Sequence, residues 1–397
     1  MRIIRKSIAR KAVLLFLLLG GALYGGYELT KYYKIDVYDW PYILGGVGLL
    51  LFLVLLTFLV NIYRPLKRLT KEVRSLLTGN KYQRVSPTTV DEVGVLTHFF
   101  NEITKDLEKI SADIKESKRM SSELDIAAQI QKEVLPKEAP EAPGLDVVAK
   151  TRAAAEVGGD NFDFVPSIDG NQLFIYIGDV TGHGVPAGLI MMMVDTLVST
   201  LAQQGVDNGR DLIAKTNEIL TPRISTKLFM TSVMLRWDKV NHKMYFTGAG
   251  HEYVLVYRAK SETVESIASG GIALGMIPDV SKIVKETEIP LEVGDSIVLY
   301  TDGITEARDE TDKMYDLESL VQSLKSHGYR PSAESIFDHL TKDFSDFVGE
   351  YVQNDDITMI VIKYVGKNVP ISKVKLTIAK DQDANEVDKK KNWDWEG

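Results

Sequence analysis

The chain has 397 residues, of which 45% are hydrophobic and 26% are charged, and its formal net charge is -8. This length and composition fit one large globular domain with smaller modules, and they exclude a disordered or fibrous protein. The acidic balance argues against nucleic acid as a partner, because DNA and RNA binding usually requires a basic surface. The chain has no Cys and six His. Thiolate nucleophiles and thiolate zinc sites are therefore excluded, and metals are expected to bind through carboxylates.

Two apolar runs near the N-terminus predict membrane-spanning helices. Residues 42–63 contain no charged side chain and are long enough to cross about 30 Å of hydrocarbon. Residues 12–27 are short for this purpose unless the helix extends back to Ile8, and they follow a basic segment at residues 1–11. A cleaved signal peptide is the alternative for this first run. Its small-residue cleavage site would lie inside the apolar run, so we favour an uncleaved anchor.

Basic residues lie before the first run and again at residues 64–74, after the second run. The positive-inside rule therefore places both termini in the cytoplasm. Residues 28–41 then form an extracytoplasmic loop that is too short for a folded sensor domain. We expect a multi-pass protein of the inner, cytoplasmic membrane with its large C-terminal domain in the cytoplasm.

Residues 64–115 predict two amphipathic helices. Pro65 lies at the membrane exit, Gly79 ends the first helix, and apolar positions in the second helix recur every three or four residues, as in a coiled coil. These apolar positions are Leu96, Phe100, Ile103, Leu107, Ile110 and Ile114.

This segment resembles the HAMP signalling module. The signature residues of that family are matched by Pro65, Gly79, Asp91-Glu92-Val93-Gly94 and Phe100-Asn101. HAMP modules form parallel four-helix bundles, so the resemblance implies a homodimer. The alternative is a pair of amphipathic helices that fold back on another part of the chain.

The same seam continues through residues 116–136, where many of its positions are small or polar. We interpret this segment as a linker helix that transmits a signal, with residues 117–122 as the part that can switch register. The prolines and glycine that follow, Pro136, Pro140, Pro143 and Gly144, predict a domain boundary. We expect a compact domain at residues 143–364 and a charged tail at residues 365–397.

The domain at residues 143–364 contains four acidic turns. Residues 173–177 are typical of a buried strand that leads into Asp179, and a helix is expected from Pro186 to about Leu201. Residues 296–300 predict a second strand, which leads into Asp302 in the same way.

The other two acidic turns lie at Asp160 and Asp163, after two glycines, and at Asp355 and Asp356, before an expected strand at residues 357–364. Neighbouring carboxylates at the ends of buried strands repel each other, and they are costly to fold without a cation. Four such turns in one domain therefore indicate a site for divalent cations.

In order and spacing these turns resemble the PPM family of metal-dependent serine/threonine phosphatases, in particular its SpoIIE and RsbU-like subgroup. The similarity covers residues 122–364 and includes Phe229-Met230-Thr231 and Gly248-Ala249-Gly250-His251. It implies an α+β fold, an α/β/β/α sandwich of two antiparallel sheets flanked by helices, with two Mn²⁺ or Mg²⁺ ions at one edge.

The resemblance assigns roles to five residues. Asp179 matches the carboxylate that bridges the two metals, and Val180 matches the neighbour that offers its backbone carbonyl to the second metal. Asp302 and Asp355 match the remaining ligands of the first metal. Asp160 matches the acid that binds a metal directly or through water, and Asp163 is expected to support it.

Two histidines, His183 and His251, lie beside glycines of these motifs, and either could protonate the leaving serine oxygen. Each could instead hold a ligand loop by hydrogen bonding. We favour His183 as the proton donor.

The resemblance implies a phosphorylated anti-sigma factor antagonist as substrate, in a partner-switching pathway. A catalytically silent signalling scaffold is the alternative, and a two-metal phosphodiesterase or nuclease is a third interpretation. The tail ends in Asn392-Trp393-Asp394-Trp395-Glu396-Gly397. It is interpreted as an untethered, solvated segment in preference to a docking peptide.

Overall fold

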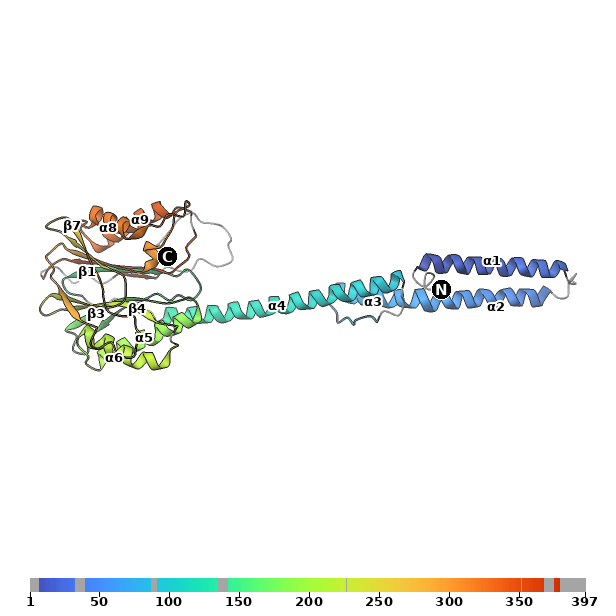
Figure 1. Ribbon diagram of the computed structural model, residues 1–397, viewed down its shortest axis with the longest axis horizontal. Coiled ribbons are helices and arrows are strands. Elements are labelled where there is room, and N and C mark those ends of the chain that lie inside the picture. Colours follow the sequence, from blue (N-terminus) through green and yellow to red (C-terminus); the bar gives the residue numbers. More distant parts are fainter. Residues whose placement is uncertain are drawn as a thin grey trace. The chain divides into compact units, whose positions relative to one another are not determined.

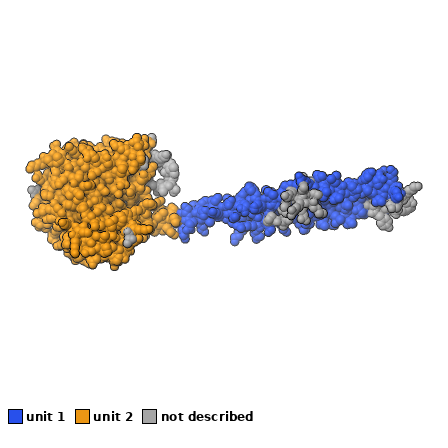
Figure 2. All heavy atoms as spheres, in the orientation of Figure 1, with its two compact units in different colours: residues 1–119 blue, residues 120–397 orange. Residues whose placement is uncertain are grey.

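The computed structural model describes residues 7–32, 40–86, 91–134, 142–225, 227–350, 352–367 and 375–378. The chain divides into two compact units, residues 1–119 and residues 120–397 (Figure 2). The division falls inside the helix that contains the predicted linker. The last part of this helix therefore belongs with the second unit.

The first unit is helical. Its elements are α1 (Ile8–Tyr32), α2 (Trp40–Phe58), a π-helical turn (Leu59–Tyr63), α3 (Arg64–Leu77) and most of α4 (Glu92–Val134). The helix α1 begins at Ile8, so it is longer than the apolar run at residues 12–27. The turn after α3 requires glycine, because Gly79 has a φ of 71°.

Among the residues that the structure describes, three helical segments are long and apolar enough to cross a membrane, judged by length and composition. Two of them, Val13–Tyr32 and Leu44–Leu77, lie in the first unit and have no buried part. The third, Val185–Gln203, is half buried, and its apolar side packs against a sheet of the second unit. The third segment is therefore part of a protein core.

The start of α4 is fixed by polar contacts. The Asp91 carboxylate accepts hydrogen bonds from the N–H groups of Val93 and Gly94, which caps the helix. Asn101 exchanges two hydrogen bonds with the backbone of Val85, at 2.8 and 3.1 Å. The connection between α3 and α4 is thereby held against α4.

The second unit contains two sheets with helices on their outer faces (Figure 1). One sheet has the strand order β11-β1-β10-β9-β6-β7, and the other has the order β2-β3-β4-β5-β8. The strands are β1 (Leu145–Arg152), β2 (Asn161–Pro166), β3 (Gln172–Val180), β4 (Met230–Asp238), β5 (Lys243–Ala249), β6 (Val254–Arg258), β7 (Thr263–Ile267), β8 (Glu286–Ile289), β9 (Ser296–Tyr300), β10 (Ile357–Tyr364) and β11 (Lys375–Ile378). The helices are α5 (Val185–Gln203), α6 (Gly209–Leu220), α7 (Asp302–Thr305), α8 (Asp316–His327) and α9 (Ala333–Val348), and a 3-10 turn covers Thr221–Arg223.

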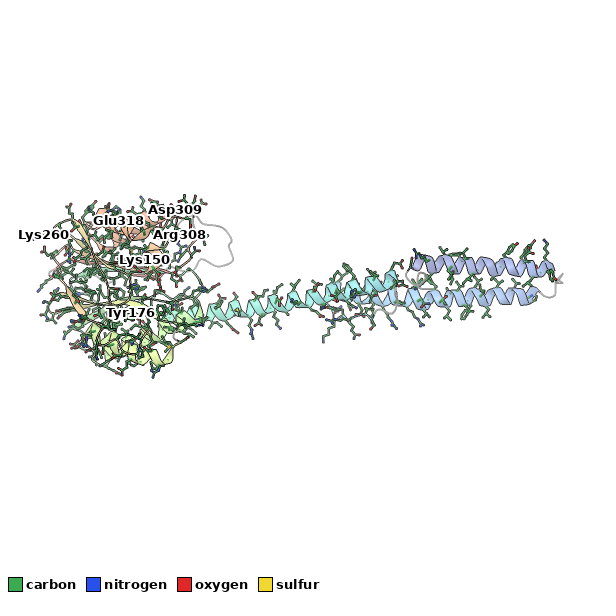
Figure 3. All side chains as sticks on the ribbon, in the orientation of Figure 1. Lys150, Tyr176, Lys260, Arg308, Asp309 and Glu318 are labelled. Carbon is green, nitrogen blue, oxygen red and sulfur yellow. The ribbon has the colours of Figure 1, made fainter. Side chains whose placement is uncertain are left out.

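Three apolar layers hold this unit together. One fills the space between the two sheets and includes Phe162 and Trp237. A second lies between the five-stranded sheet and helices α5 and α6, and a third lies between the six-stranded sheet and helices α8 and α9. Tyr176 of β3 lies on the sheet face that is covered by α5 and α6, and Lys150 of β1 lies on the sheet face that is covered by α9 (Figure 3). The layers form the predicted α/β/β/α sandwich, and the expected strands at residues 296–300 and 357–364 match β9 and β10.

One expectation for the tail is wrong. We expected an untethered tail from residue 365, but residues 375–378 form strand β11, which pairs in parallel with β1 from Val148 to Thr151. The short segment Lys375–Ile378 can join a sheet edge because strand pairing uses backbone groups. The tryptophan-containing end of the tail and the prolines Pro136 and Pro140 lie outside the described residues.

Candidate metal centre

The four acidic turns meet at one edge of the sandwich. Strands β9 and β10 are antiparallel neighbours, so the end of β9 and the start of β10 lie together. This pairing places Asp302 near Asp355. In the other sheet Asp179 is the second-last residue of β3, opposite Thr231 of β4. The two sheets thus bring their acidic ends to the same edge.

Asp160 and Asp356 are buried and well satisfied by hydrogen bonds. Asp160 accepts from the hydroxyls of Thr301 and Thr358, both at its Oδ2 atom, at 2.8 and 2.6 Å. Asp356 accepts from the backbone N–H of Ala154 at 2.7 Å and from that of Gly159 at 2.6 Å. The bonds of Asp160 and the bond from Gly159 join chain segments next to different sheets, so both acids fix the geometry of the edge.

Residues 157–160, which we call the glycine strap, run between these acids. A Cβ atom on Gly158 would lie 2.7 Å from Asp356 Oδ2. A Cβ atom on Gly159 would lie 2.9 Å from the Val180 carbonyl oxygen and 3.4 Å from Asp179 Oδ1. Only glycine lets the strap approach these oxygens so closely.

Two residues that the strap contacts, Val180 and Asp356, line an open cleft of about 360 Å³. Asp179, Val180, His183 and Asp355 line this cleft together with Asp356. A second cavity, of about 180 Å³, is lined by Asp355, Glu306 and Arg308. Asp355 is exposed and lies between the two cavities.

The acids at this edge raise one another's pKa. Burial and the charges of Asp302 and Asp355 raise the pKa of Asp179 to about 8. Burial and the charges of Asp355, Glu306 and Glu252 raise the pKa of Asp302 to about 6. Burial and the neighbouring carboxylates also raise the pKa of Asp160 well above its usual range. Such shifts mark a set of carboxylates whose negative charge is not balanced nearby.

The donor set suits Mg²⁺ or Mn²⁺, because it consists of carboxylates and the Val180 carbonyl. Two of these donor atoms, the Val180 carbonyl oxygen and Asp179 Oδ1, both lie next to Gly159. A Cβ atom on Gly159 would enter the space beside them. Within the described ranges, however, no three His, Asp or Glu side chains stand close enough together to hold one metal ion. Binding would therefore require the side chains to draw together.

The sequence interpretation did not select two acids that belong to this edge. Asp356 was taken only as the neighbour of Asp355, yet it is the buried one of the pair and binds the glycine strap. Glu306 acts on the pKa of both Asp179 and Asp302. Both residues lie in the acidic turns, but the sequence pattern does not say which acid of each turn faces inward.

The two histidines of the motifs have different surroundings. His183 is exposed and lines the cleft beside Asp355. His251 has both ring nitrogens engaged, one with the Thr231 hydroxyl and one with the Tyr300 carbonyl. Burial also lowers the pKa of His251 to about 4. His251 is therefore a structural residue, which leaves His183 as the candidate proton donor.

Asp163 does not support Asp160 as expected. The two residues are three positions apart at the start of a strand, so their side chains point to opposite faces of the sheet. Asp163 faces α5, where burial and the charge of Asp195 raise its pKa to about 7. The Tyr176 hydroxyl donates to Asp195 at 2.6 Å, and Asn161 donates to the Tyr176 oxygen at 2.9 Å. These four residues form a separate buried network.

The two-sheet sandwich of the second unit has counterparts among solved structures. Its fold is similar to that of the SiaA-PP2C domain of Pseudomonas aeruginosa, with a TM-score of 0.53 and 20% identity over 63% of this chain and 98% of that domain. Residues 169–365 match the family model of stage II sporulation protein E (SpoIIE). The chain therefore carries a SpoIIE/RsbU-like phosphatase domain, and it is a PPM-type serine/threonine phosphatase.

The curated relatives include a named phosphatase. The chain is 29% identical over 246 residues to the phosphoserine phosphatase RsbU of Bacillus subtilis, which covers 62% of this chain and 70% of RsbU. It is 24% identical over 327 residues to protein IcfG of Synechocystis, which covers 75% of this chain and 51% of that protein. The family match includes Asp179, Asp302 and Asp355 but begins after Asp160.

Proposed function

We propose that this protein is a membrane-anchored, Mn²⁺ or Mg²⁺ dependent phosphatase that removes phosphate from phosphoserine or phosphothreonine in a protein substrate. The observation that carries the proposal is the crowding of carboxylates around the cleft. The charged neighbours that raise the pKa of Asp179 are all acids. A cluster of this kind is costly to fold unless cations bind to it.

Five residues would hold two divalent ions. Asp179 would bridge them, and the Val180 carbonyl would bind the second. Asp302 and Asp355 would complete the first, and Asp160 would contribute directly or through water. Bound ions of this type provide Lewis acidity and an activated water for the hydrolysis of a phosphate ester. This chemistry needs no covalent enzyme intermediate, in agreement with the absence of Cys.

His183 would supply a proton to the serine oxygen that leaves. Its ring is exposed at the cleft beside Asp355, where a phosphorylated side chain would enter. A general acid of this kind typically contributes about 10²–10⁴-fold to the rate.

The substrate we propose is a phosphorylated antagonist of an anti-sigma factor. This proposal rests on the resemblance to RsbU-like phosphatases, and RsbU itself is named a phosphoserine phosphatase. The test uses the full chain in detergent with Mn²⁺ and a phosphorylated antagonist protein, and it measures phosphate release. Turnover that Asp179→Asn abolishes supports the enzyme. Phosphoprotein binding without turnover in the intact dimer would instead establish a silent scaffold, and activity on a dinucleotide alone would indicate a phosphodiesterase.

We also propose that the first unit anchors the enzyme and forms a HAMP homodimer. The single chain leaves most of its predicted seam in solvent, since Leu96, Ile103, Leu107, Ile110 and Ile114 are all exposed large apolar residues. A second copy packed in parallel would bury them. Cross-linking of single cysteines placed along the seam would show a regular helical pattern if this dimer forms. A flat profile would contradict it.

Regulation would reach the site through the end of α4. The Gln131 amide donates to the Gly158 carbonyl at 2.8 Å and accepts from the Gly158 N–H at 3.2 Å. Gln131 is buried, and this contact joins the linker helix to the glycine strap. A rotation of α4 would therefore displace the strap, which carries Asp160.

A further inference from the structure

The His251 ring connects the two sheets at the acidic edge. His251 lies in the connection from β5 to β6, and its Nε2 atom is 3.1 Å from the Tyr300 carbonyl oxygen. A carbonyl can only accept, so Nε2 carries the proton. Nδ1 is then an acceptor, and the Thr231 hydroxyl donates to it at 2.9 Å.

The two partners of this ring lie next to candidate metal ligands. Tyr300 is the last residue of β9 in the six-stranded sheet, two residues before Asp302. Thr231 belongs to β4 in the five-stranded sheet, where it is paired directly with Asp179. One imidazole therefore ties the strand end that carries Asp302 to the strand that holds Asp179.

The backbone around His251 is itself tightly held. The Ser269 hydroxyl donates to the His251 carbonyl, and the Gly250 N–H donates to the Gly270 carbonyl at 2.8 Å. A Cβ atom on Gly248 would lie 1.9 Å from the Ser269 carbonyl oxygen, so only glycine fits there. The imidazole is thus presented from a rigid loop, as a positioning role requires.

We propose that His251 is a positioning residue that sets the distance between Asp179 and Asp302 and thereby the affinity of the edge for divalent cations. This inference rests on the proposed metal-dependent function and goes further by naming the residue that controls metal affinity. His251 acts through its partners, because both ring nitrogens are occupied and neither can reach a substrate. Its loss should change metal affinity more than the rate at saturating metal.

Two substitutions of His251 each keep one of the two hydrogen bonds that its ring makes. The amide of His251→Asn can place an oxygen near the Nδ1 position and keep the Thr231 bond. The amide of His251→Gln can place its nitrogen near the Nε2 position and keep the Tyr300 bond. Thr231→Val removes one hydroxyl donor and conserves the shape of a β-branched strand residue. His327→Gln, far along the chain in α8, is the matched control.

The experiment measures Mn²⁺ binding to the full chain in detergent by calorimetry and by the Mn²⁺-induced rise in melting temperature, with phosphate release measured in parallel. We expect both His251 variants to weaken Mn²⁺ binding by about 10–100-fold, as outer partners of metal ligands typically do. We expect a smaller loss for Thr231→Val, no change for His327→Gln, and a turnover rate at saturating Mn²⁺ that stays within about 3-fold of the parent.

Four results would overturn the inference. If the parent protein binds Mn²⁺ and the two His251 variants bind it equally well, the positioning role of His251 is refuted while the proposed function stands. A fall in turnover with unchanged Mn²⁺ affinity would make His251 part of the chemical step. A parent protein that binds no Mn²⁺ would overturn the proposed function and this inference together. If both His251 variants fail to fold, Thr231→Val alone decides, and an unchanged Mn²⁺ affinity of this variant refutes the positioning role of His251.

Discussion

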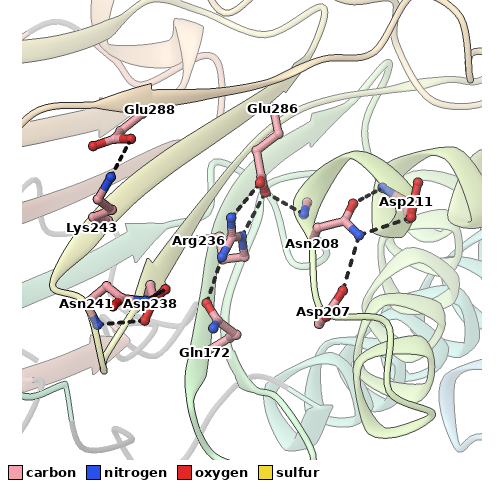
Figure 4. A network of polar contacts seen from close by, with 11 residues as sticks. Gln172, Asp207, Asn208, Asp211, Arg236, Asp238, Asn241, Lys243, Glu286 and Glu288 are labelled. Atoms are coloured by element: carbon pink, nitrogen blue, oxygen red, sulfur yellow. Dashed lines mark hydrogen bonds and ion pairs between the residues drawn. The ribbon is translucent and has the colours of Figure 1, made fainter.

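Acidic side chains at the two ends of the five-stranded sheet have opposite kinds of charged neighbours. Toward the end away from the cleft, Glu286 accepts from Arg236 at 2.6 and 2.9 Å and from the Gly209 N–H at 2.7 Å (Figure 4). Arg236 also donates to Gln172 at 2.8 Å. Each charge in this network, which we call the Arg236 network, has an opposite charge or a backbone donor.

At the acidic edge the neighbours of Asp179 are other acids, which raise its pKa. The same sheet therefore also contains an acid whose charge is balanced, in the Arg236 network, to which we assign only a role in stability. The unbalanced arrangement costs folding energy and is useful only if cations enter it. The contrast separates acids that hold the fold from acids that we assign to function.

The largest expected effect comes from Asp179→Asn. Loss of the bridging carboxylate should lower phosphate release by at least about 100-fold, because even partners of metal ligands cost 10–100-fold. The matched control is Glu286→Gln in the Arg236 network, which should leave phosphate release unchanged. Equal phosphate release by the two variants would refute the distinction between functional acids at the cleft and structural acids in the Arg236 network.

The next effect is the pH dependence of stability through the buried pair Asp163 and Asp195. The folded pKa of Asp163 is about 7 and its usual value is 3.8, so the unfolded chain loses this proton first as the pH rises. The contribution of Asp163 to the free energy of unfolding is fully present below about pH 4. It is lost as the pH rises from about 4 to about 7, by at most ~4 kcal/mol.

Asp163→Asn should flatten this dependence. Urea unfolding of the metal-free protein at a series of pH values measures it, with Asp169→Asn as an exposed control on the neighbouring turn. If the free energy of unfolding depends on pH in the same way for the parent and for Asp163→Asn, the assignment of this pH dependence to the pair Asp163 and Asp195 is contradicted.

Glu286→Gln should destabilise the domain by about 1–3 kcal/mol, because it leaves the largely buried Arg236 guanidinium short of a partner. Denaturant unfolding measures the loss. Glu288→Gln removes a more exposed ion pair with Lys243 on the adjoining strands, and it should cost no more than about 1 kcal/mol. If the two variants lose the same stability, burial does not distinguish these pairs.

The smallest effect on the domain is expected from the linker. Ser117 and Ser121 are exposed on α4 and leave the seam weakly packed. Replacing both by Leu should fix the register and hold phosphate release at one level, high or low, with little change in domain stability. Phosphate release by the full chain in detergent is the measurement, and Ser326→Leu on the outside of α8 is the control. Unchanged activity and regulation in the double variant would contradict the role of the linker.

The sequence by itself determined the strands and the positions of most acids. Alternating or continuous apolar runs followed by Asp and Gly are local signals, and they predicted β9, β10 and helix α5 close to their observed bounds. The resemblance added the sandwich and the identity of Asp160, Asp179, Val180, Asp302 and Asp355 as candidate ligands. These features depend on near neighbours in the chain or on a pattern of motifs.

Only the tertiary structure decided which side chains meet. It buries Asp356 and leaves Asp355 exposed, it turns Asp163 away from Asp160 toward Asp195, and it gives both nitrogens of His251 to different sheets. It also joins β11 of the tail to β1. Adjacent residues of one sequence motif can face opposite sides of a strand, and partners far along the chain depend on how the two sheets stack. The local pattern of the sequence carries no information about these distant partners.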